Sequence, residues 1–182
     1  ADSYMRDDGS IGQNYNVKYL TDISQVNTRQ KPRIMRYDNK LLLRVFLNSS
    51  QAEVQVVDEI TGIDRSAFYD KNSDVLYIAR GAEVPQIFHE VTHELAKQEI
   101  GENNTLDSFK AKCVSYMICK KYGIDVSNYN ITDIPYELKE MSAKEIREEL
   151  EPIHEAMENI SGRTSHCLEL IAKQNREKEQ VR

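Results

Sequence analysis

The sequence has no tryptophan, only three cysteines and no long apolar run. A bilayer-spanning helix needs about 20 consecutive apolar residues, and no stretch approaches that length, so we predict no membrane span. The polar start, residues 1–14, also lacks the apolar segment of a secretory signal. Cys113, Cys119 and Cys167 are too few and too scattered for a disulfide framework, and an odd number suits a reducing compartment. We therefore expect a cytoplasmic protein.

Positive charge is also scarce. The chain has 24 Lys and Arg residues against 30 Asp and Glu, a net charge of -6. Such a surface repels polyanions, which disfavours a nucleic-acid or membrane-surface role. The weakest of our functional hypotheses is nucleic-acid contact through local basic residues, namely Arg29, Lys31, Arg33, Arg36, Lys110, Lys120 and Lys121.

The 182 residues, 40% of them hydrophobic, suffice for one sizeable core. Residues 1–15 have low hydrophobicity and no periodicity, which predicts a flexible lead-in. We expect a domain over residues 16–136 and a C-terminal helical extension that packs on it over residues 137–182. The chain ends in charged residues, as expected of a domain cut from a longer protein.

Apolar periodicity and turn residues predict an α+β fold with a small mixed or antiparallel sheet. Residues 84–100 form the clearest helix, with Pro85 in the first turn and Gly101 after the end. The other predicted elements are a short apolar segment at 17–23 followed by a polar arm at 24–33, a buried helix or strand at 38–47, a strand at 52–60, a hairpin of 66–69 with 75–79, and a second packing helix at 105–122. Because the run 75–79 directly precedes the clearest helix, it is a candidate edge strand for pairing with an extended peptide, or a plain sheet edge.

The C-terminal region carries apolar residues in alternating steps of four and three, the spacing of a packing stripe. The stripe consists of Ile146, Leu150, Ile153, Met157, Ile160, Thr164, Cys167 and Ile171. Pro152 and Gly162 interrupt it, so one long helix and two or three shorter ones both fit the pattern. The stripe can dock on its own domain or form a seam with a partner.

The motif that carries chemistry is His89-Glu-Val-Thr-His93, an H-E-x-x-H sequence within the predicted helix 84–100. Residues four apart lie on one helical face, so His89 and His93 can bind one Zn²⁺ ion. Glu90 is then placed to act as general base on a metal-bound water.

A third ligand is less clear, because the next predicted helix carries lysines where a carboxylate is expected. Cys113 is a possible ligand, although a cysteine there is more often a small buried hydrophobe. Asp107 begins the same helix. Tyr116 can line the site as a ligand or oxyanion donor, or serve as a core aromatic residue.

These residues, together with Ser115-Tyr-Met-Ile-Cys-Lys-Lys-Tyr-Gly-Ile-Asp125, resemble the compact zincin-like domain of the ImmA/IrrE and ArdC antirestriction groups. The similarity is greatest to LtrC-like proteins of Gram-positive conjugative elements, which have phrases like those at residues 145–150 and 160–163. Residues 21–27 also resemble a segment near the start of these domains, and the resemblance covers most of residues 17–165. It implies an α+β zincin fold, with His89 and His93 as zinc ligands and Glu90 as general base.

In the peptidase relatives the third ligand is a Glu at a position that falls on or beside Lys112 here. A protonated lysine cannot donate to zinc and repels it. Two functions remain open on this basis. One is a zinc-dependent peptidase that cleaves a protein partner, and the other is a catalytically degenerate zincin-fold binding module within a larger conjugative-element protein.

Overall fold

The computed structural model describes residues 2–5, 11–14 and 37–180, and it is an α+β protein. The chain divides into two units at residues 33 and 34. The first unit contains an antiparallel pair, β1 (Asp2–Met5) with β2 (Ile11–Asn14), in a region where the sequence gives no strand signal. The segment and arm predicted at 17–33 lie outside the described residues.

The second unit is built on a three-stranded mixed sheet in the order β3-β5-β4. β4 (Ala67–Asp70) and β5 (Val75–Ala79) form the predicted antiparallel hairpin around a turn at Asp74, and β3 (Glu53–Val57) pairs with β5 in parallel. β5 is therefore the central strand, so the prediction that residues 75–79 form an edge was wrong. Strand order could not be read from the sequence, because the parallel partner β3 comes before the hairpin.

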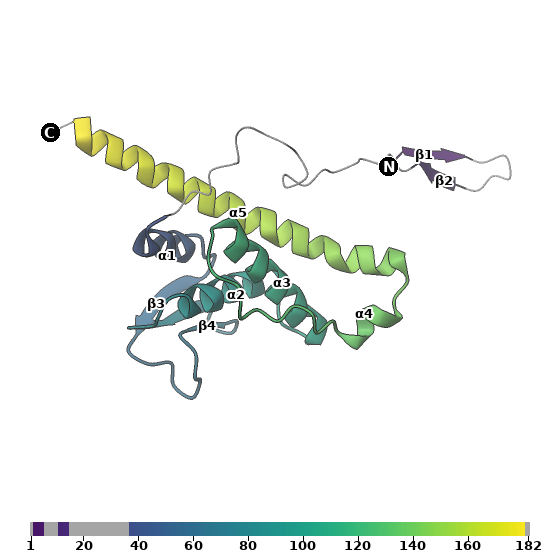
Figure 1. Ribbon diagram of the computed structural model, residues 1–182, viewed down its shortest axis with the longest axis horizontal. Helices are drawn as coiled ribbons and strands as arrows, with labels where there is room; N and C mark the ends of the chain where they lie inside the picture. Colours follow the sequence, from purple (N-terminus) through teal and green to yellow (C-terminus); the bar gives the residue numbers. More distant parts are fainter. Residues whose placement is uncertain (1, 6–10, 15–36, 181–182) are drawn as a thin grey trace. The chain divides into compact units, whose positions relative to one another are not determined.

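Three helices pack beside this sheet (Figure 1). They are α1 (Asn39–Asn48), which Asp38 caps by accepting backbone hydrogen bonds, α2 (Gln86–Ile100) and α3 (Thr105–Lys121). Helix α2 lies against β4, and both α1 and α3 pack on α2. The core between them is fully buried at Phe46, Leu76, Phe88, Val91 and Ile118. The segment 38–47, which periodicity left open between helix and strand, is thus helical.

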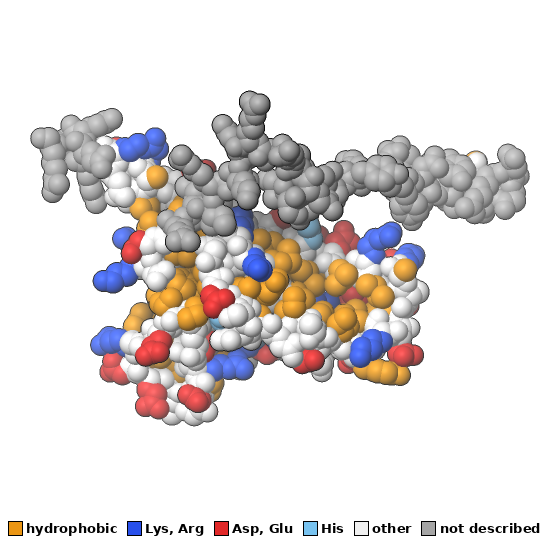
Figure 2. Space-filling model, in the orientation of Figure 1, with side chains coloured by type: hydrophobic (Ala, Val, Ile, Leu, Met, Phe, Trp, Pro, Cys, Tyr) orange, Lys and Arg blue, Asp and Glu red, His pale blue; other side chains and the backbone are white. Residues whose placement is uncertain are grey.

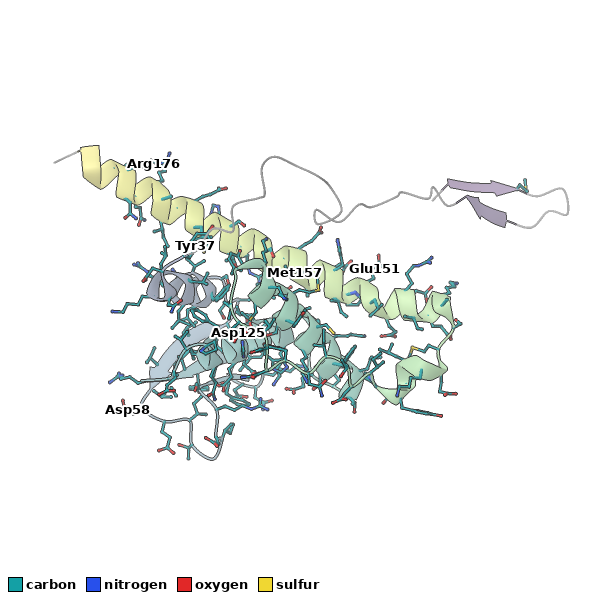
Figure 3. The ribbon with its side chains drawn as sticks, in the orientation of Figure 1. Tyr37, Asp58, Asp125, Glu151, Met157 and Arg176 are labelled. Carbon is teal, nitrogen blue, oxygen red and sulfur yellow. The ribbon has the colours of Figure 1, made fainter. Side chains whose placement is uncertain are left out.

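After the short helix α4 (Tyr136–Glu140), one continuous helix, α5 (Ala143–Gln180), runs through Pro152 and Gly162. It lies across α1, α2 and α3. The middle of the predicted stripe is buried, including Ile153, Ile160 and Thr164, whereas Leu150 is 41% exposed. Met157 lies where α5 crosses the body, and the exposed Arg176 lies on the part that extends past it (Figure 3).

Arg163 fixes the crossing of α5. Its Nε donates to the backbone oxygen of Ser49 at 2.8 Å, after the end of α1, and its guanidinium pairs with Glu99 of α2 at 2.6 Å. On the face shown in Figure 2, hydrophobic side chains form a band across the middle of the described body, and charged side chains stand mainly at its margins. Within the described parts of the chain, no helix is long and apolar enough to cross a membrane.

Candidate functional site

Helix α2 carries the whole H-E-x-x-H motif, as predicted from its flanking Pro85 and Gly101. Val91 and Leu95 are fully buried and fix the inner face of the helix. His89, Glu90 and His93 are each half-buried along its flanks. The fold therefore holds these three side chains at the margin of the core, where the partners of each decide what it can do.

Glu90 is engaged at both carboxylate oxygens. The backbone N–H groups of Ser66 and Ala67, at the start of β4, both donate to its Oε2, the second at 2.9 Å. Gln86, one turn earlier in α2, donates to its Oε1 at 2.8 Å. Among the described strands β4 is an outer one, paired on one side only. Glu90 therefore supplies on the other side the acceptor that a neighbouring strand otherwise supplies.

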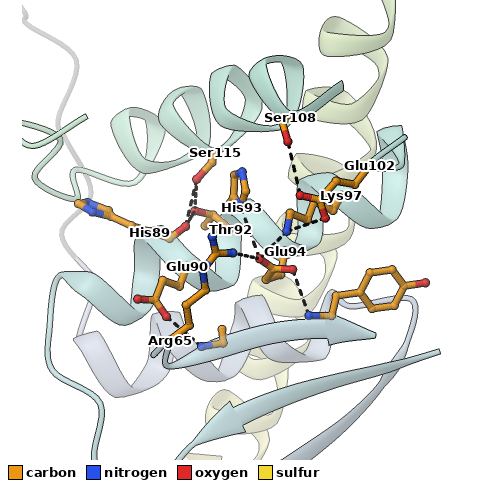
Figure 4. A network of polar contacts seen from close by, with 12 residues as sticks. Arg65, His89, Glu90, Thr92, His93, Glu94, Lys97, Glu102, Ser108 and Ser115 are labelled. Atoms are coloured by element: carbon orange, nitrogen blue, oxygen red, sulfur yellow. Dashed lines mark hydrogen bonds and ion pairs between the residues drawn. The ribbon is translucent and has the colours of Figure 1, made fainter. Parts of the chain in front are cut away.

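Glu94, four residues on, extends this pattern along the same strand (Figure 4). Its Oε2 accepts a hydrogen bond from the backbone N–H of Tyr69 at 3.0 Å. Its Oε1 lies 3.1 Å from Nζ of Lys97, 3.6 Å from the guanidinium of Arg65 and 3.5 Å from Nδ1 of His93. Two glutamates of α2 thus cap the edge of β4 at alternate residues, which is the period of a strand.

Glu94 is only 1% exposed, so its charge depends on these partners. Burial by itself raises the pKa of the carboxyl group, but the contacts with His93, Lys97 and the Tyr69 N–H outweigh it and hold the pKa below its ordinary value. Lys97 is itself 5% exposed and also pairs with Glu102 at 2.9 Å. Glu94 is therefore a buried, charged structural centre next to the second histidine of the motif.

His89 points to a different neighbour. Its Nε2 lies 2.5 Å from the backbone oxygen of Asp125, in the loop after α3. A carbonyl oxygen only accepts, so this contact places the proton of the imidazole on Nε2. The His89 ring also meets the ring of Tyr129 edge-on, with centroids 4.6 Å apart.

A buried hydroxyl cluster anchors α2 to α3 behind His89. Thr92 Oγ1 donates to the backbone oxygen of Phe88 at 2.7 Å and lies 2.7 Å from Ser115 Oγ. Ser115 Oγ in turn lies 2.5 Å from the hydroxyl of Tyr129. Burial raises the pKa of Tyr129 far above its ordinary value, so this hydroxyl stays protonated. Its role is to hold the loop after α3 against Ser115 through a hydrogen bond.

The expected third-ligand positions on α3 do not complete a metal site. Lys112 and Cys113 are half-buried, and Cys113 packs against the hydrophobic core. Burial raises the pKa of the Cys113 thiol, although the neighbouring Lys112 opposes this effect, so the thiolate that zinc requires is disfavoured. Asp107 instead lies 3.8 Å from Lys110 and accepts hydrogen bonds from Asn103.

Tyr116 joins an aromatic group with Tyr129, their ring centroids 5.9 Å apart. Since Tyr129 also contacts His89, the structure links Tyr116 to the first histidine of the motif through one intervening ring. Lys120 lies over the Tyr116 ring at 5.9 Å. Tyr116 thus has the aromatic surroundings of a packing residue.

The donor set does not fit a three-ligand zinc centre. Nε2 of His89 contacts the carbonyl oxygen of Asp125, and lysine stands where a third ligand is expected. Among the side chains that the structure describes, no group of three or more His, Cys, Asp or Glu is placed to hold a metal ion.

The sequence did not predict roles for Glu94, Tyr129 and Asp125. Glu94 gives a usable signal, because it lies one turn after Glu90 and one turn before Lys97 on a helix with an otherwise apolar inner face. Tyr129 and Asp125 lie in the loop after α3, and the path of a loop over α2 is not encoded in periodicity.

Most of the basic residues suggested for nucleic acid have other roles or are not described. Arg29, Lys31, Arg33 and Arg36 lie outside the described residues. Lys110 is buried and pairs with Glu149 at 2.5 Å. Lys121 lies over the ring of Tyr122 at 5.6 Å.

Comparisons with known proteins identify no relative of this chain. No protein-family model matches the chain, and neither curated proteins nor solved structures provide a match. The site is therefore interpreted from its own geometry.

Proposed function

We propose that this chain is a protein-binding domain built around an H-E-x-x-H helix that has no peptidase activity. The observation that carries the proposal is the position of Glu90. Both of its oxygens accept hydrogen bonds, from the β4 backbone and from Gln86. A general base needs a free lone pair directed at the water that it deprotonates. Three of the roughly four acceptor positions of the Glu90 carboxylate are already occupied, and the two bonds from the start of β4 hold it at the sheet edge.

Lys112 and His89 support the same proposal. A lysine at the expected third-ligand position adds a positive charge where a zinc site needs a negative one. Nε2 of His89 donates a hydrogen bond to the carbonyl oxygen of Asp125. That contact has to break before Nε2 can bind a metal. The resemblance to zincin-like domains fits a protein that has kept the fold but lost the metal site, and that forms part of a larger mobile-element protein.

A zinc-dependent peptidase acting on a protein partner is the second candidate, and one observation favours it. Nδ1 of His93 faces the Glu94 carboxylate at 3.5 Å. Metal-binding histidines commonly hold a carboxylate at the nitrogen that does not bind the metal. This pairing leaves Nε2 of His93 as the outward nitrogen.

The state of the cysteines favours a reducing compartment. Cys113, Cys119 and Cys167 are all free thiols. We place the protein in the cytoplasm on this basis.

Zinc content by elemental analysis, on protein purified without chelator, separates the two candidates. We expect far less than one zinc per chain in the wild type and in His93→Ala, with no cleavage of an unfolded protein substrate such as casein. About one zinc per chain that is lost in His93→Ala, together with casein cleavage that is lost in Glu90→Gln, would overturn the proposal. His154→Ala is the matched control, because this histidine of α5 is exposed and lies outside the motif.

Lys112→Glu tests the role of the lysine directly. If Lys112 is what prevents metal binding, the glutamate variant gains zinc toward one per chain, and the gain disappears when His93→Ala is added. No gain would assign the loss of the site to His89 and its contact with Asp125.

A further inference from the structure

We propose that the outer edge of β3, with the groove between β3 and α1, binds an extended peptide segment whose apolar residues are flanked by acidic ones. This inference rests on the proposed function, since it names the surface and the class of partner. The first observation that supports it is a difference between the two outer strands of the sheet in how their outer backbone groups are paired. Glu90 and Glu94 cap the edge of β4, whereas among described residues β3 pairs only with β5.

The backbone of β3 offers hydrogen-bonding groups on its outer side. The N–H of Glu53 donates to Asp74, and the oxygen of Val57 accepts from Arg80, both on the β5 side. Because successive backbone groups of a strand point in opposite directions, the N–H and C=O groups of Val54 and Val56 point outward. An added strand can pair with these groups, as in other cases of strand addition.

An apolar groove runs beside this edge. It has a volume of about 380 Å³ and is lined by Leu43 and Leu47 of α1 and Val54 of β3, with Lys40, Arg44 and Asn48. Val56 lies on the same face of β3 as Val54 and is 55% exposed, which extends the apolar strip along the strand. A strand added here would place alternate side chains over this strip.

The charge at the groove selects the partner. Lys40 and Arg44 are exposed one helical turn apart, and neither forms an ion pair with any described residue. This local positive pair contrasts with the net charge of -6 of the chain. The acidic Glu53 lies on the opposite face of β3, because strand side chains alternate. Carboxylates flanking an apolar segment therefore complement the groove, and lysines do not.

The test measures fluorescence anisotropy of a labelled nine-residue peptide, with EDTA present. Its five central residues alternate valine and threonine, and two glutamates flank them at each end. The control is the same peptide with lysine in place of every glutamate. We expect the glutamate peptide to bind at least about tenfold more tightly than the lysine peptide. The double variant Lys40→Glu with Arg44→Glu changes two exposed side chains, so the fold is retained, and the preference for the glutamate peptide is expected to disappear.

A second pair of variants tests strand pairing. Val56→Pro removes the outward N–H without touching a bond to β5, and proline is tolerated at such edge positions. We expect it to weaken binding of the glutamate peptide by about tenfold or more, whereas Val56→Ala, which keeps the N–H, changes binding by less than about threefold. Equal binding of the two peptides, or no binding to the wild type, overturns the inference.

Two further outcomes are separable. Self-association of the wild type that Val56→Pro abolishes, seen by analytical ultracentrifugation, assigns the edge to a second copy of this chain and also overturns the inference. Because EDTA removes any metal, peptide binding at β3 is measured independently of the H-E-x-x-H motif. Zinc-dependent casein cleavage would overturn the proposed function and leave the β3 result standing.

Discussion

Replacing Glu90 with alanine separates a structural carboxylate from a catalytic one. The side chain accepts backbone hydrogen bonds from Ser66 and Ala67, and Ala67 is fully buried. A hydrogen bond to a charged acceptor contributes about 1.5–3 kcal/mol, and a buried N–H without a partner costs about 1–3 kcal/mol. Water can replace the acceptor at the half-buried Ser66, so we expect Glu90→Ala to lower the free energy of unfolding by about 2–4 kcal/mol.

Urea and thermal unfolding followed by circular dichroism measure this loss. For a chain of this size, about 2–4 kcal/mol corresponds to a decrease in Tm of roughly 5–12 °C. Glu90→Gln keeps an acceptor oxygen in place, so we expect it to cost only about 1 kcal/mol. The control is Glu155→Ala, the same substitution at an exposed position of α5, which is expected to change stability by less than about 0.5 kcal/mol. If Glu90→Ala costs no more than Glu155→Ala, Glu90 does not hold the edge of β4, and its carboxylate is free to act as a general base.

Three other predictions concern stability. The folded-state pKa of Glu94 lies below its ordinary value of 4.5, so the charged carboxylate stabilises the fold above that pH. We expect the free energy of unfolding to fall as the pH decreases below about 4.5. Glu94→Gln is expected to flatten that part of the urea-unfolding profile, and an unchanged profile would assign the acid sensitivity to other carboxylates. Ile160→Ala is expected to cost about 2–4 kcal/mol, because this α5 side chain is fully buried where the helix packs on the body. Leu170→Ala, at a position of α5 that is 47% exposed, is expected to be nearly neutral, and equal losses would mean that α5 does not dock as described. Gly101, at the end of α2, has a φ of 86°, which an alanine adopts only with strain. Gly101→Ala is therefore expected to lower the free energy of unfolding by about 1–3 kcal/mol in thermal unfolding. No loss would show that the backbone at the end of α2 adopts another conformation.

Elements with local signals were predictable from the sequence. The prediction of a helix at 84–100 corresponds to α2, and that at 105–122 corresponds to α3, because capping residues mark both ends. The turn cluster at 70–74 marks the hairpin. The capping box at Ser142 and Glu145 marks the start of α5, where Glu145 accepts a hydrogen bond from the Ser142 N–H at 2.7 Å.

Features that depend on distant partners were not predictable. The parallel pairing of β3 with β5 depends on which strands meet, and periodicity contains no information on that choice. The H-E-x-x-H spacing correctly placed three residues on one helix, but the direction of each side chain depends on neighbours. Glu90 turns to β4 and His89 turns to Asp125, and both partners are main-chain groups that no sequence pattern marks.

The crossing of α5 implies a gradient of local opening along one helix. Its middle, from Ile153 to Thr164, is held by buried side chains and by Arg163, whereas residues 172–177 near its C-terminal end are exposed. Amide hydrogens in the middle can exchange only when the helix leaves the body, whereas those near the C-terminal end can exchange by fraying of a few turns. An element that is one helix in the ribbon therefore comprises one cooperative segment and one end that opens independently.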